Sequence, residues 1–175
     1  MTFAELRERL PDTAKDLRLN LDAIARIETL TPSQLWGGVL ASALATRHAD
    51  VIRAAAAEAR SRLDPAAFAA TYDAVRTAAS LMAMNNVYYR FRHMIEKPAY
   101  SQRPARLRMQ RIAQPATNKL DFELLCLAVS SINGCEACVK AHEQAVIDGG
   151  LTEEHVHDAV RIAAVVHAAA VGLEA

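Results

Sequence analysis

The chain has 175 residues, about the length of one ordinary domain, and 52% of them are hydrophobic, so a sizeable core can be buried. Twenty basic and twenty acidic side chains give a formal net charge of zero. This balance excludes a strongly basic surface for nucleic acid or for an anionic membrane. We therefore expect one folded domain over residues 1–175, with no nucleic-acid partner.

The sequence also argues against a membrane or secreted protein. The first 20 residues carry charges of both signs, and no later segment approaches the roughly 20 uncharged residues of a membrane span. Three cysteines, an odd number, do not suggest a secreted disulfide framework. We expect a cytoplasmic protein without a membrane partner, in which cysteine serves chemistry or the core.

Signals for helices dominate the first two thirds of the chain, which only a few glycines and prolines interrupt. Thr31-Pro32-Ser33-Gln34 combines an N-cap hydroxyl, a proline at the first helical position and a capping-box glutamine. Asp64-Pro65 begins a second helix, which we expect to reach about Arg90. The stretch from Lys97 to Asn118 holds three prolines and is expected to be a loop.

The last third contains three further helix signals. One helix is expected from about Leu120 to Ser131, where Asn133-Gly134 provides a stop and a turn. The next helix begins at the cysteine pair and ends at Gly149-Gly150, and Thr152 opens the last one. The sequence thus predicts an all-α protein of seven or eight helices, without a sheet.

A short internal match suggests a repeated architecture. Asp73–Ala79 and Asp158–Ala164 agree at six of seven positions, 85 residues apart. Two similar helical halves would explain the match, and so would chance similarity between two alanine-rich helices. Chemistry need not be repeated, because all three cysteines lie in the second half.

The segment Cys135-Glu136-Ala137-Cys138 carries the strongest chemical signal. It falls at the start of a helix, where unpaired N–H groups favour a thiolate, the reactive form of cysteine. Helical spacing places Cys135 and Cys138 on one face, able to close a disulfide across one turn. His142, four residues beyond Cys138, is positioned to serve that thiol. Redox chemistry is therefore the favoured interpretation of the pair.

Three other interpretations of the cysteines remain open. A zinc site would need four ligands, with only Cys126 and the histidines to complete it. A structural disulfide in so small a loop would remove little unfolded-state entropy. Buried cysteines can also be simple core residues. For Cys126, within Leu124–Ala128, the core is the favoured interpretation.

Glu123 is the remaining candidate, because it stands alone in a nearly apolar helix. It is either a first-turn glutamate favoured by the helix dipole or the partner of another group. If its helix packs against the Cys-x-x-Cys helix, Glu123 and His142 can form a proton-transfer pair. The other histidines are expected to be surface or structural residues, and Met82 to belong to the core.

With these residues, the sequence resembles the alkylhydroperoxidase D family, a branch of the carboxymuconolactone decarboxylase-like superfamily. The specific part is Cys-x-x-Cys-x-x-x-His with the upstream Glu123. The resemblance covers nearly the whole chain and includes Leu10-Pro11 with Ala14–Leu17, Leu35–Gly37, Ala41–Ala43, Ala45–Arg47, Met84–Val87 with Tyr89-Arg90, Leu107–Met109 and Phe122–Leu124.

The resemblance implies an all-helical, homotrimeric antioxidant enzyme. It would reduce alkyl hydroperoxides through its dithiol and also reduce a partner peroxiredoxin, alkyl hydroperoxide reductase C (AhpC). Its electrons would come from dihydrolipoamide on a lipoylated acyltransferase, recharged by dihydrolipoamide dehydrogenase and NADH. No bound cofactor or metal is implied.

The resemblance also implies a role for each of Cys138, Cys135, His142 and Glu123. Cys138 matches the cysteine that becomes the sulfenic acid, and Cys135 matches its proton donor and disulfide partner. The helix dipole alone would favour Cys135 as the thiolate, but the proximity of His142 favours Cys138, in agreement with the family. One departure is Ala137, where well-known relatives have a histidine.

Two further functions remain as alternatives. The chain could be a non-catalytic dithiol adaptor that passes electrons from lipoamide to a peroxiredoxin. It could also be a decarboxylase or lactone-processing enzyme of the same superfamily, although such an enzyme would not use a dithiol.

Overall fold

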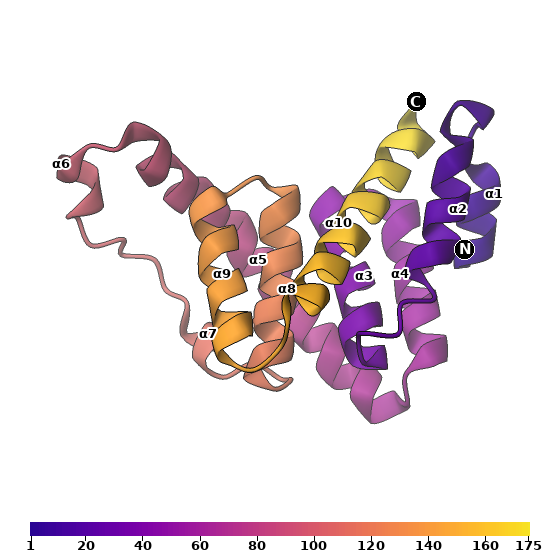
Figure 1. Ribbon diagram of the computed structural model, residues 1–175, viewed down its shortest axis with the longest axis horizontal. Helices are drawn as coiled ribbons and strands as arrows, with labels where there is room; N and C mark the ends of the chain where they lie inside the picture. The colour runs from indigo at the N-terminus through magenta and orange to yellow at the C-terminus, as the bar shows by residue number, and fades with distance from the viewer.

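The computed structural model describes residues 1–175 and is helical throughout, without a strand (Figure 1). Eight helices have seven residues or more, and two are single turns of four, so the predicted all-α architecture is confirmed. In order, the elements are α1 (Phe3–Arg9), the 3₁₀ turn η1 (Asp12–Ala14), α2 (Lys15–Ile24), α3 (Pro32–Thr46), α4 (Ala49–Arg62), α5 (Pro65–Ile95), α6 (Pro98–Ser101), α7 (Gln110–Ala113), α8 (Lys119–Ile132), α9 (Glu136–Asp148) and α10 (Glu153–Glu174).

The helices begin where the capping signals predict. The Thr31 hydroxyl accepts from the Gln34 backbone N–H, while the Gln34 side chain accepts from the Thr31 N–H. Asp64 caps α5 by accepting from two backbone N–H groups. α5 then runs to Ile95, five residues beyond the expected end, because no breaker occurs before Glu96, which adopts a left-handed conformation.

The expected loop between Lys97 and Asn118 needs a correction. It contains the single-turn helices α6 and α7, separated by an extended stretch (Figure 1). Pro98 supplies the fixed φ angle that suits a first helical position, so it starts the turn of α6. A proline-rich segment thus excludes a long helix without excluding isolated turns.

One continuous hydrophobic core joins the helices, with 33 buried residues in a single cluster. α3 and α8 lie side by side in its centre, and α5 and α10 pack against both. α10 alone is long and apolar enough, by length and composition, to cross a membrane. It packs against α2, α3 and α8, as expected of a core helix.

Two sets of three helices share one layout. In α3–α4–α5 the first helix packs extensively against the other two, and α8–α9–α10 repeats this arrangement. α8 and α9 begin 87 residues after α3 and α4, and α10 begins 88 residues after α5. These correspondences support two similar helical halves. The short sequence match, at 85 residues, is about one helical turn out of step with the starts of α5 and α10.

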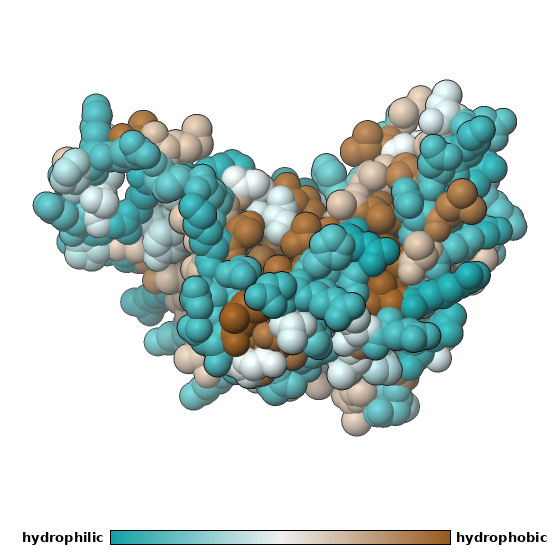
Figure 2. All heavy atoms as spheres, viewed as in Figure 1, coloured by the Kyte–Doolittle hydropathy of each residue, from teal (hydrophilic) through white to brown (hydrophobic).

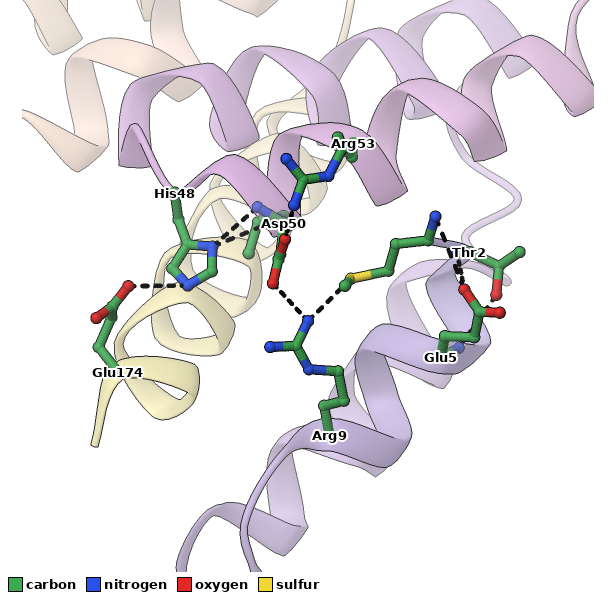
Figure 3. Close-up of polar contacts among 9 residues, drawn as sticks. Thr2, Glu5, Arg9, His48, Asp50, Arg53 and Glu174 are labelled. Atoms are coloured by element: carbon green, nitrogen blue, oxygen red, sulfur yellow. Dashed lines mark hydrogen bonds and ion pairs between the residues drawn. The ribbon is translucent and has the colours of Figure 1, made fainter.

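Polar contacts join helix α1 and the end of α10 to helix α4 (Figure 3). Arg9 of α1 donates to Asp50 of α4, which also pairs with Arg53. His48, the N-cap of α4, lies 3.1 Å from the carboxylate of Glu174 at the end of α10. Segments near both termini of the chain therefore contact the start of α4.

The C-terminal part of α5 and the short helix α6, residues 87–101, form an arm. Its base contacts α9 through His93 and Glu136, and its far end projects from the helical body (Figure 1). Phe91 and Tyr100 hold the arm together, with ring centroids 5.3 Å apart. Figure 2 shows apolar residues near the end of this arm and in the hollow between α9 and α10. The large apolar side chains exposed on the arm are Val87, Phe91, Met94, Ile95 and Tyr100.

Candidate active site

The cysteine pair lies at the start of α9, as the sequence predicts. Gly134 adopts a left-handed conformation with φ 64°, which turns the chain from α8 into α9. Cys135 is the N-cap and Cys138 lies in the first turn. The two sulfurs form a disulfide, with the Cα atoms 5.3 Å apart. The predicted pairing across one turn is therefore present, and Cys126 remains free.

The packing of α8 against α9 brings Glu123 and His142 together. His142 Nδ1 lies 2.6 Å from Glu123 Oε2, and both side chains are largely buried. The other carboxylate oxygen, Oε1, lies 2.5 Å from the Lys119 ammonium group, one turn earlier on α8. Glu123 is thus a partnered carboxylate, which resolves the two interpretations left open by the sequence.

The charge of Glu123 is set by opposing effects. Burial, the largest effect, raises the pKa of its carboxyl group, but hydrogen bonds and charges from His142 and Lys119 lower it. The net result is a pKa below the usual value, so Glu123 is ionised near neutral pH. An ionised carboxylate on Nδ1 fixes the orientation of the imidazole ring and favours a proton on that nitrogen.

A cavity of about 290 Å³ lies beside Cys138 and His142. α5, α7 and α9 form its wall, which is largely apolar. Most of this wall has no local signal in the sequence, although the i, i+3, i+7 spacing of Met82, Asn85 and Tyr89 marks one face of α5. The lining residues are Met82, Asn85, Tyr89, Met109, Ile112, Ala137, Cys138, Ala141 and His142.

Two contacts tie this cavity to the Glu123–His142 pair. The second imidazole nitrogen, His142 Nε2, lies 3.2 Å from the sulfur of Met82. Lys119 also donates to the backbone carbonyl of Ile112, at 3.2 Å, and so connects the carboxylate to the α7 wall. Met82 therefore belongs to the core, as predicted, and also to the site, which the sequence did not reveal.

The remaining chemistry-bearing residues lie apart from this site. Cys126 is fully buried among apolar side chains, and desolvation raises the pKa of its thiol far above the usual range, as expected for a core cysteine. Glu136 turns outward to Lys140 and His93 instead of facing the cysteines. No group of three or more His, Cys, Asp and Glu side chains converges as metal ligands would.

The fold and the site together define the class of the protein: an all-helical protein with a Cys-x-x-Cys disulfide at the start of a helix. The sequence model of the Carboxymuconolactone decarboxylase family matches residues 98–175, the part of the chain that contains Glu123, both cysteines of the disulfide and His142.

Relatives extend the match over nearly the whole chain, which belongs to the alkyl hydroperoxide reductase AhpD family. An AhpD from Anaeromyxobacter sp. (strain Fw109-5) is 61% identical over 171 residues, covering 97% of this chain and 90% of the relative. The protein of that name from Anaeromyxobacter dehalogenans (strain 2CP-C) is 57% identical over 169 residues, covering 97% and 89%. The one from Gluconacetobacter diazotrophicus is 53% identical over 174 residues, covering 99% and 93%.

Proposed function

We propose that this protein reduces alkyl hydroperoxides to alcohols with the Cys135–Cys138 dithiol as reductant. The observation that carries the proposal is the disulfide at the edge of an apolar cavity, with a buried imidazole–carboxylate pair beside it. The names of its relatives, alkyl hydroperoxide reductase AhpD, support the same substrate class.

In the proposed reaction the reduced dithiol supplies both electrons. Glu123 holds His142 through Nδ1, and Nε2, whose neighbour is the proton-free sulfur of Met82, takes the proton of Cys138. The Cys138 thiolate attacks the terminal peroxide oxygen, which breaks the O–O bond and gives a sulfenic acid and an alkoxide. Cys135 provides the proton that turns the alkoxide into the alcohol. The Cys135 thiolate then attacks the sulfenic sulfur and closes the disulfide, and the departing hydroxide takes the proton held by His142 and leaves as water.

The proposed electron supply begins with an external dithiol. Dihydrolipoamide, carried on a lipoylated acyltransferase, would exchange with the disulfide, and dihydrolipoamide dehydrogenase would regenerate it from NADH. The reduced protein would also pass electrons to AhpC. This scheme places the protein in the cytoplasm, and the free thiol of Cys126 supports a reducing compartment.

We further propose a homotrimer built from one domain over residues 1–175. The continuous core supports the single domain. The apolar side chains exposed along residues 87–101 support an assembly that covers the arm. Sedimentation equilibrium tests the mass, and a stable monomer at micromolar concentration would contradict the trimer.

An NADH-consumption assay tests the proposed function. Hydroperoxide, AhpC, lipoamide and dihydrolipoamide dehydrogenase are each omitted in turn. Turnover of a hydroperoxide without AhpC is the expected result, because the cavity beside Cys138 can admit a small apolar substrate. Turnover only when AhpC is present would instead identify a dithiol adaptor. Turnover without any thiol donor would contradict both.

A further inference from the structure

Asn85 is a buried amide without a partner on the wall of the active-site cavity. Its side chain is 6% exposed, and its Oδ1 atom has no hydrogen-bond partner. An unpaired buried carbonyl is costly and uncommon in folded proteins, since burial removes its hydrogen bonds to water. A group of this kind on the wall of a cavity is suited to a ligand that supplies the missing bond.

The neighbouring residue shows that the unpaired amide is specific to this position. Asn86 is also buried, but its amide donates to the Ser130 hydroxyl at 2.9 Å and accepts from the Asn133 amide at 2.9 Å. The two asparagines are consecutive residues of α5, so their side chains point in different directions. Asn86 completes a buried structural network, whereas Asn85 lines the cavity with its oxygen unpaired.

The cavity wall contains few polar residues besides Asn85. Seven of the nine lining residues are hydrophobic, and the other two are Asn85 and His142. Both nitrogens of His142 already have neighbours, Glu123 on one side and the Met82 sulfur on the other. Asn85 Oδ1 is therefore a buried acceptor on this wall that has no hydrogen-bond partner and no part in the proton transfer assigned to His142.

We infer that Asn85 binds the peroxide group of the substrate, an inference that rests on the proposed hydroperoxide reductase function. A hydroperoxide has one O–H donor and two acceptor oxygens, so a single amide can pair with it in both directions. Oδ1 accepts from the peroxide O–H, and an amide N–H donates to the oxygen that carries the alkyl substituent. The apolar remainder of the wall receives that substituent.

This arrangement assists the reaction at the point where charge develops. As the Cys138 sulfur attacks the terminal oxygen, the O–O bond breaks and negative charge builds on the departing alkoxide. A hydrogen bond from the Asn85 amide strengthens as that charge grows, so it lowers the barrier as well as holding the substrate. The proton that completes the alcohol still comes from Cys135.

The test compares the reactive group of the substrate with its substituent. Hydrogen peroxide, tert-butyl hydroperoxide and cumene hydroperoxide share the O–O group and differ in apolar bulk. Asn85→Leu should lower kcat/KM by about 10² to 10³, the usual loss for one such donor, and by a similar factor for all three. Ile112→Ala, on the apolar wall, should instead lower it most for cumene hydroperoxide.

A second reaction of the same disulfide serves as the control. Reduction of Cys135–Cys138 by dithiothreitol involves no hydroperoxide, so Asn85→Leu should leave its rate within about twofold. Asn85→Ala and Asn85→Ser form a matched pair in case leucine disturbs folding. The serine hydroxyl, a remaining donor, should restore part of the hydroperoxide activity that alanine loses and should not affect the dithiothreitol rate.

The possible outcomes distinguish failure of the proposed function from failure of the role assigned to Asn85. Wild-type protein without hydroperoxide turnover would refute the proposed function, and the role of Asn85 with it. Wild-type turnover that Asn85→Leu leaves nearly unchanged would refute only the role of Asn85. An equal loss in both reactions would show that Asn85 acts through folding or through the thiols, which also overturns it.

Discussion

The two helical halves of the molecule share a layout and differ in the few residues that carry chemistry. At a spacing of 87 residues, the left-handed residue before the second helix is Arg47 in the first half and Gly134 in the second. The following N-cap is His48 in one and Cys135 in the other. The same backbone conformation therefore precedes a capping histidine in the first half and a cysteine in the second.

The same spacing relates the rest of the site to core residues. Cys138 and His142 of α9 correspond to Val51 and Ala55 of α4, both fully buried. The matched positions Gln34 and Asp121 even bond to each other, with Nε2 donating to Oδ1 at 2.7 Å where the halves meet. The shared helical layout therefore supports the site, while a few polar residues on α8 and α9 supply its reactivity.

Replacing Cys138 should have the largest effect on hydroperoxide turnover, because it removes the sulfur that attacks the peroxide. The first half has no cysteine to take its place. Cys138→Ser should abolish hydroperoxide turnover, since a serine hydroxyl is not ionised near neutral pH. Cys126→Ala, which alters the third cysteine, should retain turnover. Peptide mapping after peroxide treatment should recover Cys135 linked to Cys138, and a main product containing Cys126 would contradict the assignment.

The Glu123–His142 pair should give the next largest effect. A positioned general base is worth about 10² to 10⁴ in rate, so His142→Phe and Glu123→Gln should each lose a large part of that range. The double substitution should cost little more than the worse single change, because the two residues act as a unit. Hydroperoxide reduction from about pH 5 to 9 measures all three variants. Fully additive losses would show that the helix terminus alone activates Cys138.

Replacing Lys119 should have a smaller effect, which acts through the charge of Glu123. Lys119→Met removes a hydrogen bond and a positive charge that lower the pKa of this carboxyl group, so the pKa rises. Protonated Glu123 then appears at a higher pH, and the acid limb of the activity profile moves upward. The loss should be a few-fold near pH 5 and small at neutral pH. Lys119→Arg should restore the profile, and a uniform loss at every pH would contradict this role.

The smallest expected effect tests the backbone that the two halves share. Gly134→Ala should lower the free energy of unfolding by about 1 kcal/mol, because alanine is strained at φ 64° although no atom lies within 4 Å of the added Cβ. Arg47→Gly, at φ 62°, should raise it by up to about the same amount. Thermal unfolding should show shifts of about 2–4 °C in opposite directions. Shifts of the same sign would refute the equivalence of these two turns.

The sequence was most informative where local chemistry decides the structure. Caps such as Thr31 and Asp64 act within one turn, so the starts of α3 and α5 could be predicted from adjacent residues. Cys135, Cys138 and His142 lie on one helix, so their common face followed from its period. Glu123 was recognisable as a lone carboxylate in an apolar helix.

The parts that escaped prediction depend on contacts between distant segments. Asn85 and Met109 come to one cavity only because α5 and α7 pack beside α9, and no local pattern encodes that approach. No local pattern marks Lys119, whose ammonium group the structure places on Glu123. The short helices α6 and α7 were missed because prolines mark the break of a long helix better than the start of a single turn.

The burial of Cys126 gives the molecule an internal standard for its redox state. Because the thiol of Cys126 is fully buried and its pKa is far raised, a polar alkylating reagent should not modify it in the folded protein. Folded protein should then take up a label at Cys138, which lines the cavity, when it is reduced, and none when it is oxidised. Unfolded protein should always take up a label at Cys126. The position of the label therefore reports oxidation and folding separately, in one measurement and without an added tag.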